Sequence, residues 1–463
     1  MPTTTSRTRP VNALGSAAVI LTLLLSGGCN ELNVPDFNNL DLGDLETNPT
    51  PAKIAQAAQG MLIGARVQIG EQNGYVSLLG ILGRESYNFD PADPRFITEM
   101  LIGPLDGGSP AFGGNLFEIP YRNIRNGNTL LGAVDAVAGL TDEQREATRG
   151  FVKTIQALDY LEVINTRDDL GAPIDVNQDP TSEPAPIATK DQVFDHIVQL
   201  LDEGSAHLQA GGASFPFGLS DGFANFATPA SFLTFNRALL ARVEVYRGNY
   251  AAALEALDAS FLDPDAPLTF GAYHSYSTRS GDLQNQLFDP TGRAILAHPS
   301  IITDAQLRPD GSLDARTSKV TQLDEPRTVQ GITTDLVFTI YQSNIDPIPI
   351  IRNEELILLR AEANLGLDNL TAALDDIDFI RERSGGLAAY SGPVTQSALL
   401  DELLYNKRYS LLFEGGHRWI DARRYGRLDE LPLAVPTHHV LGRFPFPEAE
   451  CLARAQAPPE GCG

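Results

Sequence analysis

The sequence is short of basic residues. Its 463 residues include 34 lysines and arginines against 59 aspartates and glutamates, which gives a formal net charge of −25. A surface this acidic repels phosphate groups and anionic headgroups over most of its area, so we do not expect the protein to bind nucleic acid.

Motifs typical of enzymes are also missing. The sequence contains no His-Glu-x-x-His, no Gly-x-Ser-x-Gly and no phosphate-binding glycine loop ending in Gly-Lys-Ser/Thr. The adjacent His438 and His439 suit a solvated turn better than a metal site. Acidic pairs are so abundant in this chain that none can be singled out as the two carboxylates of a glycosidase. We predict a protein that is not an enzyme and uses neither a cofactor nor a metal.

Long apolar runs are scarce, and the one extended run lies near the N-terminus. It spans residues 13–25, after two arginines and shortly before Cys29. Basic residues, an apolar stretch and small residues in this order predict a secretory signal peptide over residues 1–28. The run is too short for a transmembrane helix, which needs roughly 20 apolar residues.

The stretch "LLLSGGC", which ends at Cys29, resembles the lipobox of bacterial lipoproteins, whose cysteine carries acyl chains after cleavage. Ser26 stands where leucine is most common in that pattern. We predict that Cys29 is a lipid anchor. The alternative is ordinary cleavage, which would leave an unexplained free thiol.

Cysteine is rare, and the two that remain, Cys451 and Cys462, lie at the C-terminus in "CLARAQAPPEGC". In an exported chain, two close cysteines without nearby histidines favour a disulfide over a zinc site. We predict a disulfide that holds the tail, with a pair of frayed thiols as the alternative.

Hydrophobic periodicity predicts a mainly α-helical chain. A polar tether over residues 29–49 precedes a first helix that starts near Thr50 and Pro51. Apolar residues at three- and four-residue spacings predict further helices over 141–165, 189–209 and 396–415. Glycine, proline and serine indicate loop-rich insertions with little β structure at about 70–120, 210–230 and 262–345.

An internal repeat indicates the architecture. Residues 241–260 align with residues 361–380 at an offset of 120, with identical residues at Ala241/Ala361, Asn249/Asn369, Ala252/Ala372, Ala253/Ala373, Leu254/Leu374 and Asp258/Asp378. Each copy has the pattern of two helices around a short turn, with alanine where the helices approach closely. Tetratricopeptide-like hairpins have this form and bury their apolar faces by stacking. We predict a single domain over residues 50–463, with such hairpins as its scaffold.

Several segments together resemble the SusD/RagB family of bacterial outer-membrane lipoproteins. They are "CNELNVPDFNN" after the lipobox, "GFVKTIQALDYLEVINTRDDLGAPI" (150–174), "RALLARVEVYRGNYAAAL" (237–254), "IIRNEELILLRAEANLGLDNLTAALDDIDFIRERSGG" (350–386), "LLFEGGHRWIDARRYG" (411–426) and "RFPFPEAE" (443–450). The resemblance covers nearly the whole chain after Cys29.

The resemblance implies a lipid-anchored protein of the outer membrane, exposed at the cell surface. Such a protein captures an oligosaccharide or peptide and presents it to a TonB-dependent, SusC-like transporter, without catalysis. The alternative is a tetratricopeptide-like scaffold of the cell envelope that binds proteins and no small ligand. An exported hydrolase is a third, weaker hypothesis.

The stretch "LLFEGGHRWIDARRYG" holds the only tryptophan of the chain together with a histidine, two acids and three arginines. Such a cluster is typical of an active site, but ion-paired arginines beside a buried aromatic stabilise a scaffold equally well. We interpret it as a structural motif, whose members are Glu414, Arg418, Trp419, Asp421 and Arg424.

Ligand binding needs aromatic faces and hydrogen-bonding groups on exposed loops. The phenylalanines at 215, 217, 223 and 226 favour packing of their own loop. Tyrosines among polar neighbours are better candidates, and we predict ligand-binding roles for Tyr273, Tyr276, Arg279, Tyr75 and Tyr87.

Overall fold

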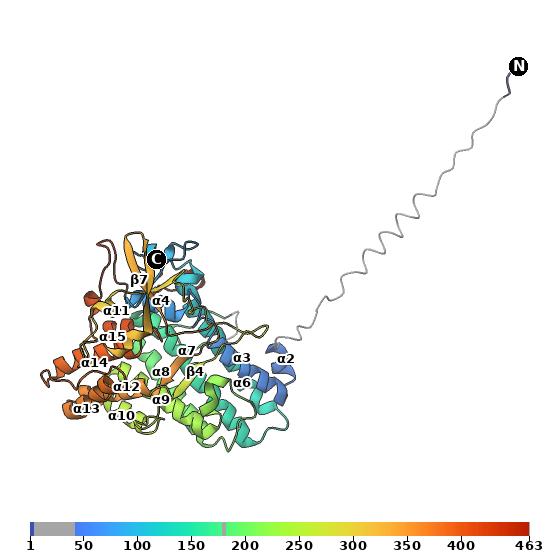
Figure 1. Ribbon diagram of the computed structural model, residues 1–463. Helices are drawn as coiled ribbons and strands as arrows, with labels where there is room; N and C mark the ends of the chain where they lie inside the picture. Colours follow the sequence, from blue (N-terminus) through green and yellow to red (C-terminus); the bar gives the residue numbers. More distant parts are fainter. Residues whose placement is uncertain (4–41, 178–181, 463) are drawn as a thin grey trace. The chain divides into compact units, whose positions relative to one another are not determined.

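The computed structural model describes residues 1–3, 42–177 and 182–462 (Figure 1). The helices and strands of the described residues lie in the larger of two units, which runs from Leu42 to Gly463. Cys29 and almost all of the predicted signal peptide lie outside the described residues. Among the described residues, no helix has both the length and the apolar character that a bilayer crossing requires.

Helices dominate the unit, and the predicted mainly α-helical class is confirmed. Their bounds are α2 (Leu42–Thr47), α3 (Pro51–Gly64), α4 (Tyr75–Leu82), α5 (Arg95–Thr98), α6 (Asn115–Ala133), α7 (Asp142–Arg167), α8 (Lys190–Gln209), α9 (Pro229–Arg247), α10 (Tyr250–Asp258), α11 (Ser300–Thr303), α12 (Asn353–Gly366), α13 (Leu370–Arg383), α14 (Gln396–Ser410), α15 (His417–Arg424) and α16 (Glu448–Ala453).

The predicted helix starts follow from capping chemistry. Thr50 caps α3, and its hydroxyl accepts a hydrogen bond from the Lys53 N–H at 3.3 Å. Thr141 and Thr189 begin α7 and α8 with complete capping boxes, in which a glutamine three residues later bonds back to the cap. Each box satisfies backbone N–H groups that a helix start otherwise leaves unpaired.

The two copies of the repeat adopt the same structure. In α9/α10 the turn residue Asn249 has φ −85° and ψ 62°, and in α12/α13 the matching Asn369 has φ −82° and ψ 60°. Ala253 and Ala373 are fully buried, which lets the paired helices approach closely. The repeat therefore identified two equivalent helical hairpins correctly.

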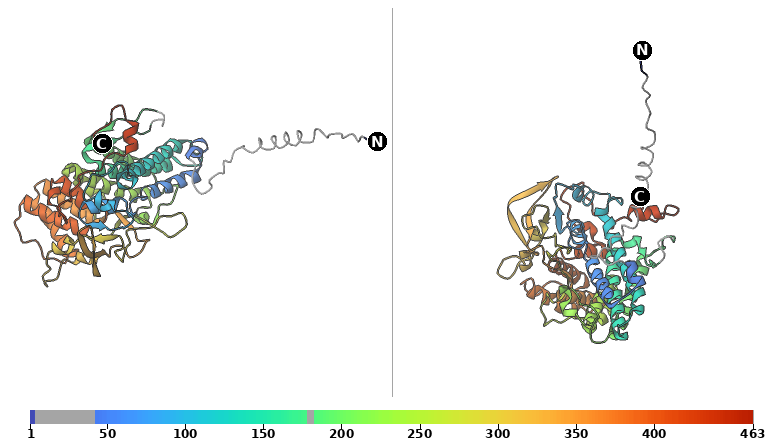
Figure 2. Two further views of the ribbon diagram at one scale, coloured as in Figure 1. Left: turned by 90° about the horizontal axis from the view of Figure 1, so that it is seen from above. Right: turned by 90° about the vertical axis from the view of Figure 1, so that its right-hand side faces the viewer.

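These hairpins belong to a larger stack of helices. α7 packs on α8, α8 on α9, and α12 packs on α9, α10, α13 and α14. Figure 1 shows α9, α10, α12 and α13 together in the lower part of the molecule, with β7 (Ile332–Phe338) and α4 above them. The right-hand view of Figure 2 shows the β hairpin that contains β7 at one edge of the molecule.

The strands form one four-stranded antiparallel sheet and two strand pairs. The sheet has the order β1 (Ser86–Asn88), β5 (Ile295–Ala297), β7 (Ile332–Phe338), β6 (Val320–Val329), and the pairs are β2 (Ala172–Pro173) with β3 (Ile187–Ala188) and β4 (Gly271–His274) with β8 (Ile348–Arg352). β1 comes from the first predicted insertion and β5 to β7 from the last. The sheet thus joins two regions that are far apart in the sequence.

Two boundaries differ from the prediction. Within residues 70–120, α4 is buried along its whole length and α6 begins at Asn115. The predicted tether ends in α2, which packs on α6 with Leu45 buried. Tertiary packing stabilises these helices, although each gives a weak helical signal: α2 and α4 are short, and α6 contains four asparagines, two glycines and Pro120.

The structure joins Cys451 and Cys462 by a disulfide, with their Cα atoms 5.6 Å apart. The bond closes the C-terminal loop at α16. The phenylalanines at 215, 217, 223 and 226 are all buried, and Phe215 and Phe217 lie against Phe151 of α7. They pack their loop on the helices, as predicted.

Candidate functional site

Three of the tyrosines predicted to bind ligand are buried. Tyr75, Tyr87 and Tyr276 expose 6%, 2% and 7% of their surface. Tyr75 lies on the buried helix α4. Tyr87 points from β1 into the core, where its ring stacks on that of Phe89 with the ring centroids 5.8 Å apart. Their rings are not available to a ligand in solvent, and this part of the prediction is corrected.

The other two predicted residues lie nearer to solvent. Tyr273, on β4, is half-buried, and its hydroxyl donates a hydrogen bond to the Thr269 carbonyl. Arg279 is exposed in the loop after β4. A role for this pair in ligand binding stays a prediction.

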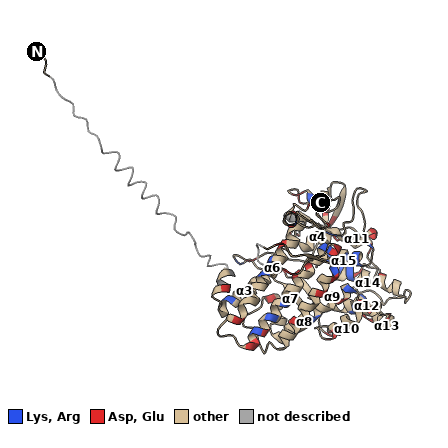
Figure 3. Cartoon of the chain, turned by 180° about the vertical axis from the view of Figure 1, so that it is seen from behind, with Lys and Arg blue, Asp and Glu red and all other residues tan. Residues whose placement is uncertain are grey.

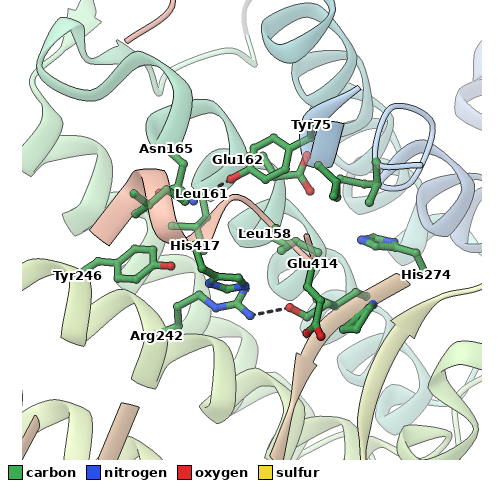
Figure 4. Close-up of a pocket in the computed structure, with 16 residues that line it drawn as sticks. Tyr75, Leu158, Leu161, Glu162, Asn165, Arg242, Tyr246, His274, Glu414 and His417 are labelled. Atoms are coloured by element: carbon green, nitrogen blue, oxygen red, sulfur yellow. Dashed lines mark hydrogen bonds between the residues drawn. The ribbon is translucent and has the colours of Figure 1, made fainter. Parts of the chain in front are cut away.

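A polar cavity lies in the interior where α4, α7 and α9 meet (Figure 4). It has a volume of about 50 Å³, and its lining includes Tyr75, Glu162, Asn165, Arg242 and His274. One water molecule needs about 10–15 Å³ of such space, so the cavity has room for water but not for a sugar ring. We therefore exclude it as the nutrient site.

Glu162 beside this cavity gives a pH-dependent prediction. Burial raises its pKa from 4.5 to about 8, although Gln68 and Arg242 oppose the shift. A carboxyl whose pKa is raised on folding stabilises the fold below pH 4.5, and this contribution is lost as the pH rises through about 8.

We expect Glu162→Gln to flatten the fall in stability between pH 5 and 8. The group contributes a slope of at most about 1.4 kcal/mol per pH unit. Urea unfolding of both proteins at several pH values measures the difference in slope. Parallel curves would show that Glu162 is ionised in the folded protein. Glu143→Gln, exposed in the first turn of α7, serves as the control because the pKa of Glu143 lies below its ordinary value of 4.5 and so outside this range.

A second concavity, the β1–β5 groove, opens on the surface. We define it by the residues that line it, which are Gln72, Asp90, Gln286, Phe288, Asp289, Arg293, Ala294 and Ile295. Its volume is about 340 Å³, which falls within the ≈300–1,000 Å³ range of small-ligand pockets.

Backbone hydrogen bonds join the two walls of the groove. Asn88 of β1 pairs with Ile295 of β5, and the Phe89 N–H donates to the Ala294 carbonyl at 2.7 Å. At the other end, the Gln286 N–H donates to the Gly70 carbonyl at 2.8 Å. The groove is therefore held by main-chain contacts between the first and last predicted insertions.

Strand alternation decides which side chains face the groove. Along 86–90 successive side chains point to opposite faces, so Tyr87 and Phe89 enter the core while Asn88 and Asp90 lie on the other face. The Gln72 amide bridges these two residues, at 3.5 Å from Asn88 Oδ1 and 3.4 Å from Asp90 Oδ2. The result is a wall of amide and carboxylate groups.

The opposite wall is a loop organised by one carboxylate. Asp289 accepts hydrogen bonds from the N–H groups of Arg293, Ala294 and Ile295 at 3.0, 2.7 and 2.9 Å. The loop presents Phe288 half-buried against the core and Gln286 and Arg293 exposed. Asp289 thus shapes the wall. Arg293 is exposed beside it, and Gln286 accepts a hydrogen bond from the Gln72 N–H at 3.3 Å and keeps its amide N–H groups for a ligand.

This arrangement suits a sugar. One face of the Phe288 ring packs on the core, and its exposed part can meet the apolar C–H face of a pyranose. Amide, carboxylate and guanidinium groups around it can bond to hydroxyls. The segments "EQNG" (71–74) and "LQNQLFDPTGR" (283–293) contain these groups, with amide side chains around a phenylalanine. The prediction from sequence selected tyrosines and therefore did not include them.

The arginine-rich motif of residues 411–426 is mainly structural. Trp419 is fully buried, and its indole N–H donates to the Leu441 carbonyl at 2.8 Å. Glu414 forms an ion pair with Arg352 at 2.8 Å. These contacts fit the predicted packing role.

Asp421 and Arg424 belong to a buried ring of four charges. Lys407 lies 2.7 Å from both Glu362 and Asp421, while Arg424 lies 2.7 Å from Glu362 and 2.8 Å from Asp421. Burial opposes ionisation of Glu362, but Arg424 and Lys407 outweigh it and lower its pKa to about 2. We call these four residues the charge ring.

The same region holds the C-terminal strap, which we define as residues 431–447. Arg84 donates to the carbonyls of Pro432 and His439 at 3.2 and 2.7 Å, and Arg423 donates to that of Gly442 at 2.9 Å. Together with Trp419, these side chains hold the strap by its backbone. The motif and the Phe-Pro segment that follows it form one unit.

The model of the SusD family matches residues 333–450 of this chain. The match includes the second copy of the repeat, the arginine-rich motif and the strap. Comparison with curated proteins gave no significant match.

Solved structures with the same fold include a SusD superfamily protein from Bacteroides vulgatus, at 15% identity, a TM-score of 0.66 and coverage of 89% of this chain and 99% of that one. A SusD-like carbohydrate-binding protein from Bacteroides fragilis, at 15% identity, has a TM-score of 0.66 and coverage of 84% and 88%. A laminarin-binding SusD-like protein, at 17% identity, has a TM-score of 0.60 and coverage of 86% and 97%. The resemblance predicted from the sequence is confirmed, by the family match over 333–450 and by the fold over most of the chain.

Proposed function

We propose that this SusD-like chain captures a glycan in the β1–β5 groove and delivers it to a TonB-dependent, SusC-like transporter. The groove carries the proposal, because it combines a partly exposed aromatic ring with amide, carboxylate and guanidinium groups. Similarity of fold to carbohydrate-binding and laminarin-binding SusD-like proteins supports a glycan over a peptide.

Delivery fits the features at the N-terminus. Acylation of Cys29 would hold the protein at the outer membrane, exposed at the cell surface and next to a transporter. The protein binds its ligand and does not turn it over. The groove lies on loops of the helical scaffold, where ligand sites concentrate.

The test is binding of the mature protein to a panel of soluble glycans, laminarin included, by calorimetry. For a glycan that binds, we expect Phe288→Ala combined with Gln286→Ala to weaken affinity by at least about tenfold, which corresponds to ~1.4 kcal/mol. The loss combines a stacking face and hydrogen bonds.

Gln199→Ala, on the exposed face of α8, is the matched control and should leave affinity unchanged. Thermal unfolding of each variant separates a lost contact from a lost fold. Unchanged affinity in the double variant would place the site elsewhere. Binding of proteins from the same envelope but of no glycan would favour the scaffold hypothesis.

A further inference from the structure

One residue of the arginine-rich motif is not explained by packing. Arg418 donates one hydrogen bond, to the Arg84 carbonyl at 2.7 Å. In the part of the chain that the structure describes, no carboxylate oxygen lies within 4.0 Å of its guanidinium. Its neighbours in the motif, Asp421 and Arg424, are fully engaged in the charge ring.

Arg418 lines a wide groove, which we call the α14–α15 groove. It has a volume of about 620 Å³ and is lined by Asp401, Leu404, Tyr405, Arg408, Arg418, Asp421, Ala422, Arg427, Glu430 and Leu431. One face of α14 and one face of α15 form its walls, and basic positions gather where the two helices meet (Figure 3).

The acidic groups of this groove already have cationic partners. Asp401 lies 2.5 Å from Arg427, and Glu430 lies 3.9 Å from the same guanidinium. Asp421 is bound by Lys407 and Arg424. Within the described part of the chain, Arg418 is therefore the positive charge of the groove that lacks a carboxylate partner.

Arg408 lies next to Arg418 on the groove, and its charge is paired with Asp304. One of its nitrogens binds Asp304 at 2.9 Å and another binds Ser300 Oγ at 2.6 Å, while its Nε–H is buried without a hydrogen-bond acceptor among the described residues. Arg418 thus supplies a guanidinium without a carboxylate partner and Arg408 a second guanidinium on the same groove, and guanidinium groups bind planar or tetrahedral oxyanions through their N–H donors.

We propose that Arg418 and Arg408 form a binding site for an oxyanion group, a carboxylate, sulfate or phosphate, separate from the β1–β5 groove. The apolar floor of Leu404, Ala422 and Leu431 would accommodate the uncharged part of a ligand that carries this group. The site does not depend on the proposed glycan function.

The local electrostatics support this assignment. Burial and the charge of Arg408 lower the pKa of Arg418 to about 9. The charged form of Arg418 is therefore destabilised in the folded protein, and a bound anion would stabilise it. The nearby Glu85 carboxyl does not neutralise it fully, because burial raises the Glu85 pKa to about 7.

The test is titration of the full mature protein with sodium sulfate, sodium phosphate, glucuronate and glucose at constant ionic strength. Calorimetry measures the binding, and thermal unfolding measures the stabilisation by each ligand. We expect saturable binding of at least one anion, no binding of glucose, and a loss of about tenfold or more in Arg418→Gln. Arg427→Gln, in the same groove but paired with Asp401, should change affinity by less than about threefold.

Arg418→Lys keeps the charge and guards against a variant that fails to fold. It should retain part of the affinity for the anion, because the charge is kept, but lose the paired N–H donors of the planar guanidinium. Tighter binding of glucuronate than of the inorganic anions would assign the site to an acidic sugar, and the reverse order to a free inorganic anion. The proposal is overturned if no anion binds beyond the effect of chloride, or if folded Arg418→Gln binds as the natural chain does.

Discussion

Lys407→Ala is expected to lower the free energy of unfolding by about 3–5 kcal/mol. Lys407 is buried between Glu362 and Asp421, at 2.7 Å from each. Removal of its ammonium leaves two carboxylates in the interior with Arg424 as their only close cation in the charge ring. An uncompensated buried charge costs far more than a surface pair contributes.

Denaturant unfolding at pH 7 measures this loss, and Arg427→Ala is the matched control. Arg427 binds Asp401, whose side chain is 59% exposed, so its loss should cost about 0–1 kcal/mol. Similar effects of the two substitutions would show that the charge ring contributes no more than a surface ion pair. That result would contradict its structural role.

Trp419→Ala is expected to destabilise the protein by about 3–5 kcal/mol, as is usual for a large aromatic removed from a core. Trp419 is fully buried, contacts the Phe444 ring edge-on at 6.1 Å and lies under the Arg423 guanidinium at 4.4 Å. Its loss would leave a cavity and also an unbonded Leu441 carbonyl. The strap should therefore loosen before the helical stack unfolds.

Two measurements separate these effects. Equilibrium unfolding gives the total loss, and hydrogen exchange of residues 431–447 reports on the strap. Trp419→Phe keeps much of the ring but removes the N–H donor, and we expect a smaller loss of about 1–3 kcal/mol. Exchange that stays slow in the strap of Trp419→Ala would show that Arg84 and Arg423 hold it without the indole.

The charge ring and the strap explain why a cluster of arginines around one tryptophan is not an active site. Each guanidinium that packing uses is bonded to a buried carboxylate or a backbone carbonyl. Arg418 also donates to a backbone carbonyl, that of Arg84, but among the described residues it has no carboxylate partner and it lies beside a groove. A search for function by composition alone would have treated these arginines as equivalent.

The sequence by itself determined the features that depend on local chemistry. Apolar residues at three- and four-residue spacings predicted α7 and α8, and aligned alanines and asparagines predicted two equivalent hairpins. The motif "LLFEGGHRWIDARRYG" pointed to a buried structural unit. Each of these signals lies within one turn or one helical hairpin, so neighbouring residues are enough to specify it.

Only the tertiary structure decided which side chains meet in a site. Gln72 and Phe288 are more than 200 positions apart, and the pairing of β1 with β5 brings their segments together. The same pairing turns Tyr87 into the core and Asp90 toward solvent, because strand alternation fixes a side chain's face only once its partner strand is known. Contacts over such separations depend on packing that no local pattern records.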